Sequence, residues 1–225
     1  TPHRDKTVLI VPCDAPLITP HEVEFFISNA DMNRYDHVLG LVSRKKLRHF
    51  YPHDGKPGIK MAYLHILEDS FRINNLHLVK PLRIENREYI QKMYQYRYQR
   101  NFKNLVLFGL SVFGKDKAKH YKNYIGLQLC LFFGGLGLEF MVNYFRKLNP
   151  KIELEETISS IMKTRFSALE VPFPGAALDI DNAKDYEAMK TRFDEWQKYL
   201  RTTPLTSIEK YSEAFSPSRK VVRTS

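Results

Sequence analysis

The first residue that could carry chemistry is Asp14, because it directly follows a short apolar run that is typical of a buried strand. The segment reads Val11-Pro12-Cys13-Asp14-Ala15-Pro16-Leu17. In open α/β sheets, ligands bind just beyond the carboxyl ends of the strands. A carboxylate there suits Mg²⁺, which prefers hard oxygen ligands and binds together with phosphate oxygens. The alternative is that Asp14 only caps the turn before Pro16.

A second acidic segment, Leu178-Asp179-Ile180-Asp181-Asn182, lies towards the other end of the chain. Residues 176–181 (AALDID) are predicted to form a strand, in which Asp179 and Asp181 share one face because side chains alternate. Two carboxylates on one face repel each other unless a cation or a basic group lies between them. Asp14, Asp179 and Asp181 are therefore candidate metal ligands. The alternative is that Asp181 and Asn182 only begin the helix that follows.

Basic and amide side chains that could bind an anionic acceptor lie in or directly beside two of the predicted strands. They are Arg72, Asn74, Asn75, Lys80, Lys163 and Arg165. Arg72, Asn74 and Lys80 share one face if the strand 72–79 is regular. Arginine and asparagine suit phosphate or hydroxyl oxygens, so these six residues form the predicted substrate-binding set. For each residue, the alternative is the polar face of an edge strand.

Strands and helices must alternate to position these residues. The β-branched run 7–11 (TVLIV) is typical of a strand that is buried on both faces of a parallel sheet. Thr19-Pro20-His21-Glu22 predicts a helix start, with an N-cap, a proline at the first helical position and a capping-box glutamate. Asn182 is predicted to cap a second amphipathic helix. Further strands are predicted at 37–42, 59–67, 72–79 and 165–173, and further helical segments at 85–100, 102–148 and 152–163.

The predicted elements divide the chain into three parts. Residues 1–80 and 165–203 form one α/β sheet domain. Residues 81–164 form a helical insertion that is basic and apolar, and residues 204–225 form a polar tail. The longest apolar run, 124–138, is shorter than the roughly 20 residues that a membrane-spanning helix needs.

The two acidic segments together resemble the MobA-like NTP transferases, the molybdopterin guanylyltransferase-like nucleotidyltransferases. That family carries a CD-x-P-L segment after a strand, similar to Cys13-Asp14-Ala15-Pro16-Leu17, and a D/N-I-D/N segment before a C-terminal helix, similar to Asp179-Ile180-Asp181. The resemblance implies a Rossmann-like nucleotide-diphospho-sugar transferase (GT-A-like) fold with a mixed sheet and a helical insertion. It also implies Mg²⁺ on Asp14 and Asp179, with Asp14 and Pro16 beside the bound nucleotide.

The chain departs from the family pattern before the first acidic segment. The family places a glycine-rich, phosphate-binding loop far upstream of the first acidic segment, and here 13 residues precede Asp14. We therefore expect that the 225 residues do not catalyse nucleotidyl transfer alone. Two explanations fit this expectation: the residues are part of a longer chain, or the chain is a degenerate homologue.

The resemblance implies transfer of a nucleotidyl group from a nucleoside triphosphate to a phosphorylated small molecule, such as a sugar, polyol or lipid-precursor phosphate, with release of pyrophosphate. Two alternatives are a nucleotide-sugar-dependent glycosyltransferase of the same fold and a non-catalytic membrane-surface or scaffold protein.

The charge of the chain bears on its partners. Lys and Arg number 35 against 25 Asp and Glu, and residues 80–125 alone hold eleven basic and three acidic residues. This local excess predicts an acceptor, an anionic membrane surface or a second copy as the partner of 81–164. No RNA-binding motif accompanies it, so nucleic acid is disfavoured. Cys13 and Cys130 lie far apart, which fits a reducing compartment and predicts a cytoplasmic protein, with peripheral membrane association as the other option.

Overall fold

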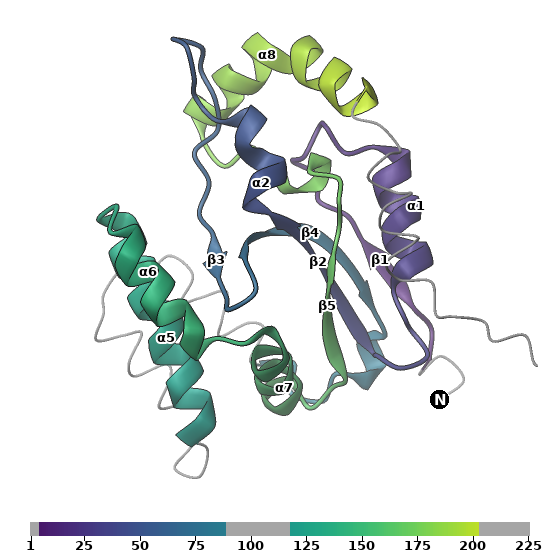
Figure 1. Ribbon diagram of the computed structural model, residues 1–225. Coiled ribbons are helices and arrows are strands. Elements are labelled where there is room, and N and C mark those ends of the chain that lie inside the picture. The colour runs from purple at the N-terminus through teal and green to yellow at the C-terminus, as the bar shows by residue number, and fades with distance from the viewer. Residues whose placement is uncertain (1–4, 89–117, 203–225) are drawn as a thin grey trace, which may run out of the picture.

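A mixed β-sheet forms the centre of the molecule in the computed structural model, which describes residues 5–88 and 118–202 (Figure 1). In these residues, five strands form one sheet in the order β1-β4-β2-β5, with β3 paired to the start of β4. The strands are β1 (Val8–Ile10), β2 (His37–Ser43), β3 (Leu64–His65), β4 (Ser70–Val79) and β5 (Phe166–Glu170). Of the predicted strand 59–67, only Leu64–His65 pairs.

Strand direction places the carboxyl ends of three strands together. β1 and β2 both run antiparallel to β4, and β5 runs parallel to β2. The three strands β1, β2 and β5 therefore point the same way, towards the start of β4. We call this end the carboxyl end of the sheet and the opposite one the amino end.

The prediction that residues 7–11 form a strand buried on both faces of a parallel sheet is wrong. β1 is an edge strand whose only described partner is β4, in antiparallel register, and Val8 and Ile10 are 45% and 49% exposed. The strand buried on both faces is β2, which lies between β4 and β5. Short apolar strands at an edge and in the interior have similar sequences, because the pattern does not record how many neighbours a strand has.

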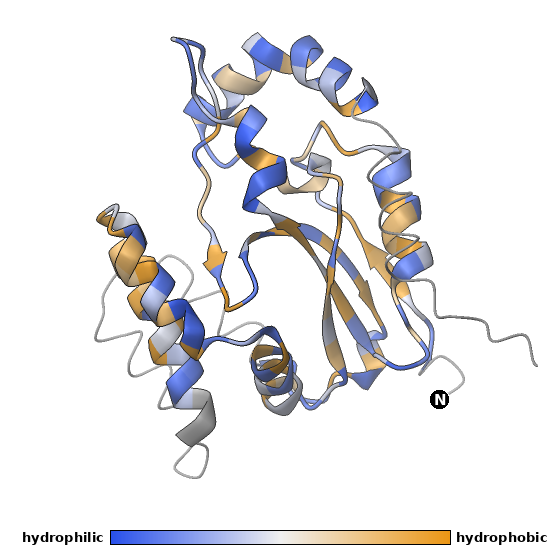
Figure 2. Cartoon of the chain, viewed as in Figure 1, coloured by the Kyte–Doolittle hydropathy of each residue, from blue (hydrophilic) through white to orange (hydrophobic). Residues whose placement is uncertain are grey.

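Helices cover both faces of the sheet. On one face, Val38 and Val42 of β2 share a core with Phe26 of α1 (Pro20–Asn29), Leu47 of α2 (Arg44–Leu47) and Trp196 of α8 (Ala183–Thr202). On the other face, Leu39 and Leu41 pack in a second core with side chains of α7 (Lys151–Met162). The alternation of β2 thus divides its side chains between two layers, and Figure 2 shows the hydrophobic residues along the sheet.

The predicted helix starts are confirmed at both ends of the chain. Thr19 caps α1 by accepting a hydrogen bond from the Glu22 backbone N–H at 3.3 Å, and Pro20 is the first helical residue. Asn182 caps α8, because its Oδ1 accepts from the backbone N–H groups of Lys184 and Asp185 at 2.9 and 3.1 Å. Both caps satisfy amide groups that a helix leaves unpaired.

A bulge of three residues interrupts β4. Leu39 pairs with His77 and Leu41 with Ile73, so residues 74–76 lie opposite Gly40 alone. Asn75 has a left-handed backbone with φ of 59°, and Asn74 turns its side chain into the core with 0% exposure. A Cβ at position 40 would overlap the Asn74 amide, so the bulge requires glycine there. The premise that 72–79 is a regular strand is therefore wrong.

Two further helices, α5 (Ala118–Gly135) and α6 (Glu139–Phe145), stand beside the sheet near β3 (Figure 1). They confirm helical structure in the described part of 102–148. No helix within 5–88 and 118–202 is long and apolar enough to cross a membrane. Most of the predicted helix 85–100 and the whole of the tail 204–225 lie outside the described residues.

We expect Gly40→Ala to lower the free energy of unfolding by about 1–3 kcal/mol, because the added methyl group overpacks against Asn74. Asn74→Ala removes the overlapping amide, so the double variant should be less destabilised than the sum of the two single variants. Denaturant unfolding of the four proteins measures this coupling. Strictly additive losses would contradict the assigned contact.

Candidate functional site

Two loops meet at the carboxyl end of the sheet. The loop after β1 carries Asp14, and the loop before α8 carries Asp179 and Asp181. The backbone N–H of Ile180 donates to the Asp14 carbonyl oxygen at 3.0 Å, which joins the two loops directly. The structure therefore brings together the two acidic segments that the sequence placed about 165 residues apart.

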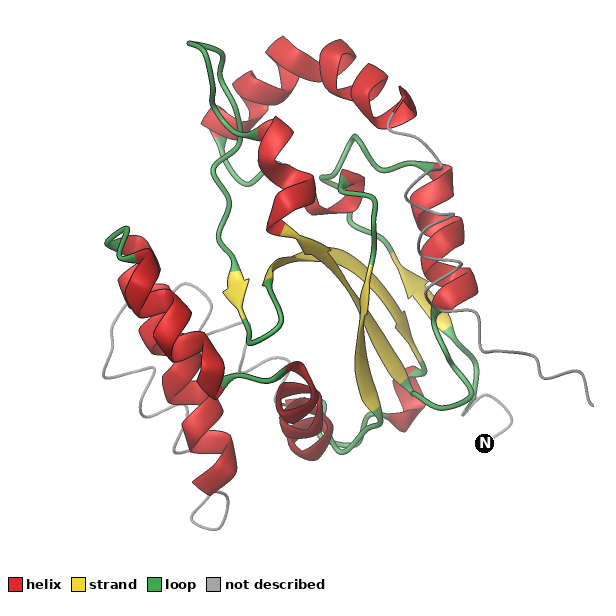
Figure 3. Ribbon diagram, viewed as in Figure 1, coloured by secondary structure: helices red, strands yellow, loops and turns green. Residues whose placement is uncertain are grey.

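The prediction of a strand at 176–181 is wrong, as Figure 3 shows. Gly175–Ala177 form a 3₁₀ turn (η4), and 178–182 are irregular. No described strand pairs with the segment, so its apolar residues Ala176, Ala177 and Leu178 reach the core from a turn. Asp179 and Asp181 consequently have different environments: Asp179 is 7% exposed, whereas Asp181 is exposed.

Arg72 holds the second loop in place. From β4, its guanidinium donates to Asp179 Oδ1 at 2.6 Å and to the Ala177 carbonyl oxygen at 2.8 Å. The side chains of Arg72 and Asp179 are 14% and 9% exposed, so water screens this ion pair less than one on the surface. Arg72, predicted to bind the acceptor, thus contacts the residue that was predicted to bind the metal.

Asp185 is a further carboxylate of this site. It is 8% exposed, and burial raises its pKa, with a further contribution from the nearby charges of Asp181 and Asp179. Its Oδ2 accepts a hydrogen bond from the Asn182 side chain at 2.6 Å. In the sequence, Asp185 is the third residue of the helix that Asn182 caps, and it also belongs to the segment 178–186 that resembles the family's second motif.

The carboxylate oxygens of the two loops are ligands that suit a Mg²⁺ ion that binds together with a substrate. Within 5–88 and 118–202, no three His, Cys, Asp or Glu side chains gather closely enough to hold a metal ion by themselves. Mg²⁺ does not require such a group, since it usually binds through one or two carboxylates plus waters and substrate phosphates. Asp14 and Asp181 are exposed and can meet a phosphate from solvent, as can Pro16. The magnesium site stays a prediction.

Glu22 is the buried acid beneath the two loops, and the sequence predicted only its capping role. It is 0% exposed, and its two oxygens accept from the Ala176 backbone N–H at 3.1 and 3.0 Å. Asn74 Nδ2 lies 3.5 Å from Glu22 Oε1. Burial raises the pKa of Glu22 to about 8, which exceeds the opposing effect of these hydrogen bonds.

The remaining predicted substrate residues do not lie beside the acidic loops. Lys80 and Arg165 converge on Asp36 at the amino end of the sheet, where Arg165 bonds both Asp36 oxygens at 2.7 Å and Lys80 Nζ lies 3.6 Å from Asp36 Oδ1. Lys163 ends α7 with a left-handed backbone. Asn74 is enclosed, and Asn75 forms the bulge. Of the six residues, the structure places Arg72 alone in contact with an acidic loop.

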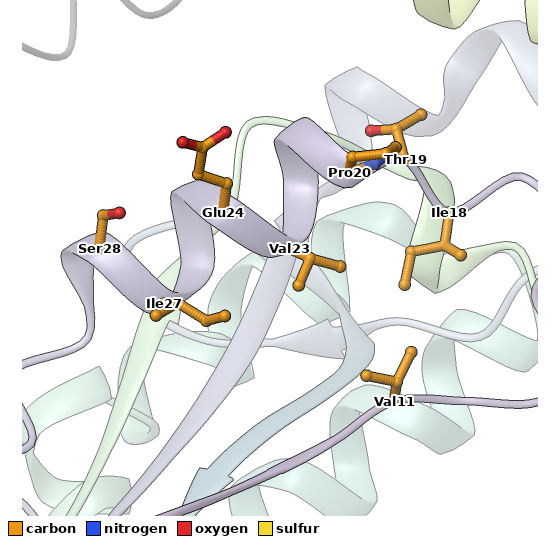
Figure 4. A pocket seen from close by; sticks show the side chains of 8 residues that line it. All are labelled: Val11, Ile18, Thr19, Pro20, Val23, Glu24, Ile27 and Ser28. Atoms are coloured by element: carbon orange, nitrogen blue, oxygen red, sulfur yellow. The ribbon is translucent and has the colours of Figure 1, made fainter.

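An open apolar groove of about 600 Å³ lies between α1 and the chain after β1 (Figure 4). Val11, Ile18, Val23 and Ile27 point into it. The groove therefore borders the loop that carries Asp14, but no predicted site residue lines it.

Comparison with known proteins places the fold. No protein-family model and no curated protein sequence matches the chain. Among solved structures, the chain is similar to one described as a hypothetical transferase from Thermus thermophilus, with a TM-score of 0.54 and 20% sequence identity. The match covers 80% of this chain and 62% of that chain, so this chain spans less than two thirds of that neighbour's length. At this identity, the likeness shows a shared α/β fold.

We expect Glu22 to make stability fall as pH rises. Its pKa is about 8 in the folded protein and near 4.5 when exposed, so the folded state binds the proton more tightly. The stabilising contribution is complete below pH 4.5 and declines up to pH 8, by at most about 1.4 kcal/mol per pH unit. Glu22→Gln should remove this decline, which urea unfolding at several pH values measures.

Buried histidines act in the opposite direction below pH 6.5. His37 Nε2 lies 3.0 Å from His77 Nδ1, and burial lowers the pKa of His37 to about 4 from 6.5. This pair destabilises the fold as pH falls through that interval, in the wild type and in Glu22→Gln alike. The difference between the two proteins therefore isolates Glu22, and an equal pH dependence in both would contradict its assignment.

Proposed function

We propose that the two acidic loops form the metal-binding half of a nucleotidyltransferase site of the MobA-like kind, on a Rossmann-like (GT-A-like) sheet. The observation that carries the proposal is the hydrogen bond from Ile180 N–H to the Asp14 carbonyl, which joins the two motif segments at the carboxyl end of the sheet. The shared fold with a protein described as a hypothetical transferase is consistent with this function. The proposal concerns the metal-binding half alone and does not depend on the glycine-rich phosphate loop of the family.

Asp14 and Asp179 would hold Mg²⁺, with Asp181 as the third predicted ligand. When bound, Mg²⁺ neutralises negative charge on the triphosphate. Arg72 keeps Asp179 oriented through its bond to Oδ1, and the backbone bond to Ile180 keeps the Asp14 loop in place. The protein's contribution is therefore prior positioning of two carboxylates.

The reaction transfers a nucleotidyl group to a phosphorylated acceptor. An oxygen of the acceptor phosphate forms a bond to the α-phosphorus, while the bond from that phosphorus to the bridging oxygen breaks and pyrophosphate leaves with the electron pair. An anionic phosphate is already a nucleophile, so a general base is not required. The catalytic demand then falls on alignment and on charge stabilisation.

We expect Asp14→Asn to weaken Mg²⁺-dependent binding of a nucleoside triphosphate by roughly tenfold or more, because one charged ligand is lost. Asp14 is exposed and joins the second loop through its backbone, so the thermal midpoint should not change. Isothermal titration with the four common nucleoside triphosphates, with Mg²⁺ and then with excess chelator, measures the affinity. Binding is the first readout because it does not depend on the acceptor.

Asp54→Asn is the matched control. Asp54 is an exposed aspartate in the loop before β3, and its left-handed backbone, with φ of 49°, suits asparagine. It should bind nucleotide as the wild type does. The proposal is overturned if the wild type shows no Mg²⁺-dependent binding or if Asp14→Asn binds equally well. Preferential binding of a nucleotide-sugar, with release of a nucleoside diphosphate, would favour a glycosyltransferase instead.

A further inference from the structure

The end of the α5–α6 hairpin carries a cluster of exposed apolar side chains. Phe132, Leu136, Phe140 and Tyr144 are 62%, 59%, 69% and 66% exposed. We call residues 131–144, which contain all four, the hairpin tip. Ring contacts from Phe132 to Phe133, from Phe133 to Phe145 and from Phe145 to Tyr144 connect the two helices. Large apolar side chains are costly to expose to water, and patches of them mark interaction surfaces.

The hairpin tip projects from the molecule. The helix pair stands beside the sheet, and Figure 2 shows hydrophobic residues along it to its free end. A Cβ at Gly135 or Gly137 would meet no atom of the described residues within 4 Å, so the rest of the described fold does not cover the turn between the helices. A protein partner would need a groove that matches this projecting apolar end, whereas a lipid surface can deform around it.

Basic residues beside this apolar end lie on α2 and not on the hairpin tip itself. The hairpin tip holds no Lys or Arg and one acidic residue, Glu139. Glu139 is paired with Arg44 at 3.0 Å, and this contact joins the tip to the start of the basic helix α2. Lys45 in α2 and Arg48, which directly follows α2, are exposed. The formal net charge of the whole chain is +10. Apolar and basic residues in this combination suit a surface of anionic lipid.

We propose that the hairpin tip binds the surface of an anionic lipid bilayer, with Phe132, Leu136, Phe140 and Tyr144 inserted among the lipid headgroups. None of the described helices qualifies as a membrane span, so the contact is interfacial. Insertion would reach about 5–10 Å, the depth usual for such elements. The inference is independent of the proposed nucleotidyl transfer.

Flotation with lipid vesicles tests the proposal on the intact chain. The wild type should float with vesicles of phosphatidylcholine mixed with phosphatidylglycerol, and bind phosphatidylcholine alone much more weakly. Raising the salt concentration should weaken the binding, because it screens the charge. A double variant, Phe132→Ser with Phe140→Ser, should lose affinity by roughly tenfold or more, since two inserted rings are removed. Both rings are mostly exposed, so the fold should be retained.

A matched pair of substitutions controls for the loss of exposed apolar surface. Ile27 of α1 and Tyr186 of α8 are 48% and 51% exposed and lie on other helices. Ile27→Ser with Tyr186→Ser should bind vesicles as the wild type does. Phe132→Trp adds a reporter, because the only natural tryptophan, Trp196, is buried. Its emission should shift to shorter wavelength on anionic vesicles alone.

Three results would overturn the proposal. The first is a wild type that does not float with the anionic vesicles. The second is a Phe132→Ser, Phe140→Ser variant that floats as well as the wild type. The third is a wild-type dimer in sedimentation experiments that this double variant dissociates, without vesicle binding, since a second copy would then cover the tip.

Discussion

A buried polar contact between β4 and α1 is the constraint on which the acidic loops depend. The bulge of β4 turns Asn74 into the core, and only glycine at position 40 leaves room for it. Asn74 lies against Glu22, and Glu22 accepts from the backbone of Ala176. These groups are buried, so each needs the others as hydrogen-bond partners. The turn that precedes Asp179 is consequently anchored to α1 by polar contacts as well as by apolar packing.

The two ends of the sheet carry different charged residues, because strand direction determines which loops and strand termini lie at each end. The carboxyl ends of β1, β2 and β5 face the loops with Asp14 and Asp179. The antiparallel strand β4 begins at that same end, and Arg72 lies near its start. Lys80, where β4 stops, meets Arg165, where β5 begins, around Asp36. Arg72 therefore organises the acidic loops, while Lys80 and Arg165 neutralise a single aspartate at the other end of β4. Sequence proximity to a strand did not distinguish these two ends.

The sequence predicted those helix caps and strands that depend on interactions between neighbouring residues. The caps at Thr19 and Asn182 and the strands at 37–42 and 72–79 were recognised because each depends on neighbouring residues. The edge position of β1, the bulge at Asn75 and the irregular segment 178–182 depend on distant partners, and the sequence patterns were wrong or silent there. Glu22 shows the limit most clearly. Its capping pattern was correct, yet its burial comes from packing against a turn more than 150 residues later.

The outer edge of β1 bears on where the described sheet can be extended. Its outer side presents unpaired backbone amides and carbonyls among the described residues, and Val8, Ile10 and Val11 beside them are apolar and exposed. Natural sheets usually protect such an edge with charge, proline or a covering element, because an open edge templates further strands. Pro12 limits the template to a few residues. In the part of the chain that the structure describes, this edge is therefore a place where a further extended segment, of this protein or of another copy, can add to the sheet.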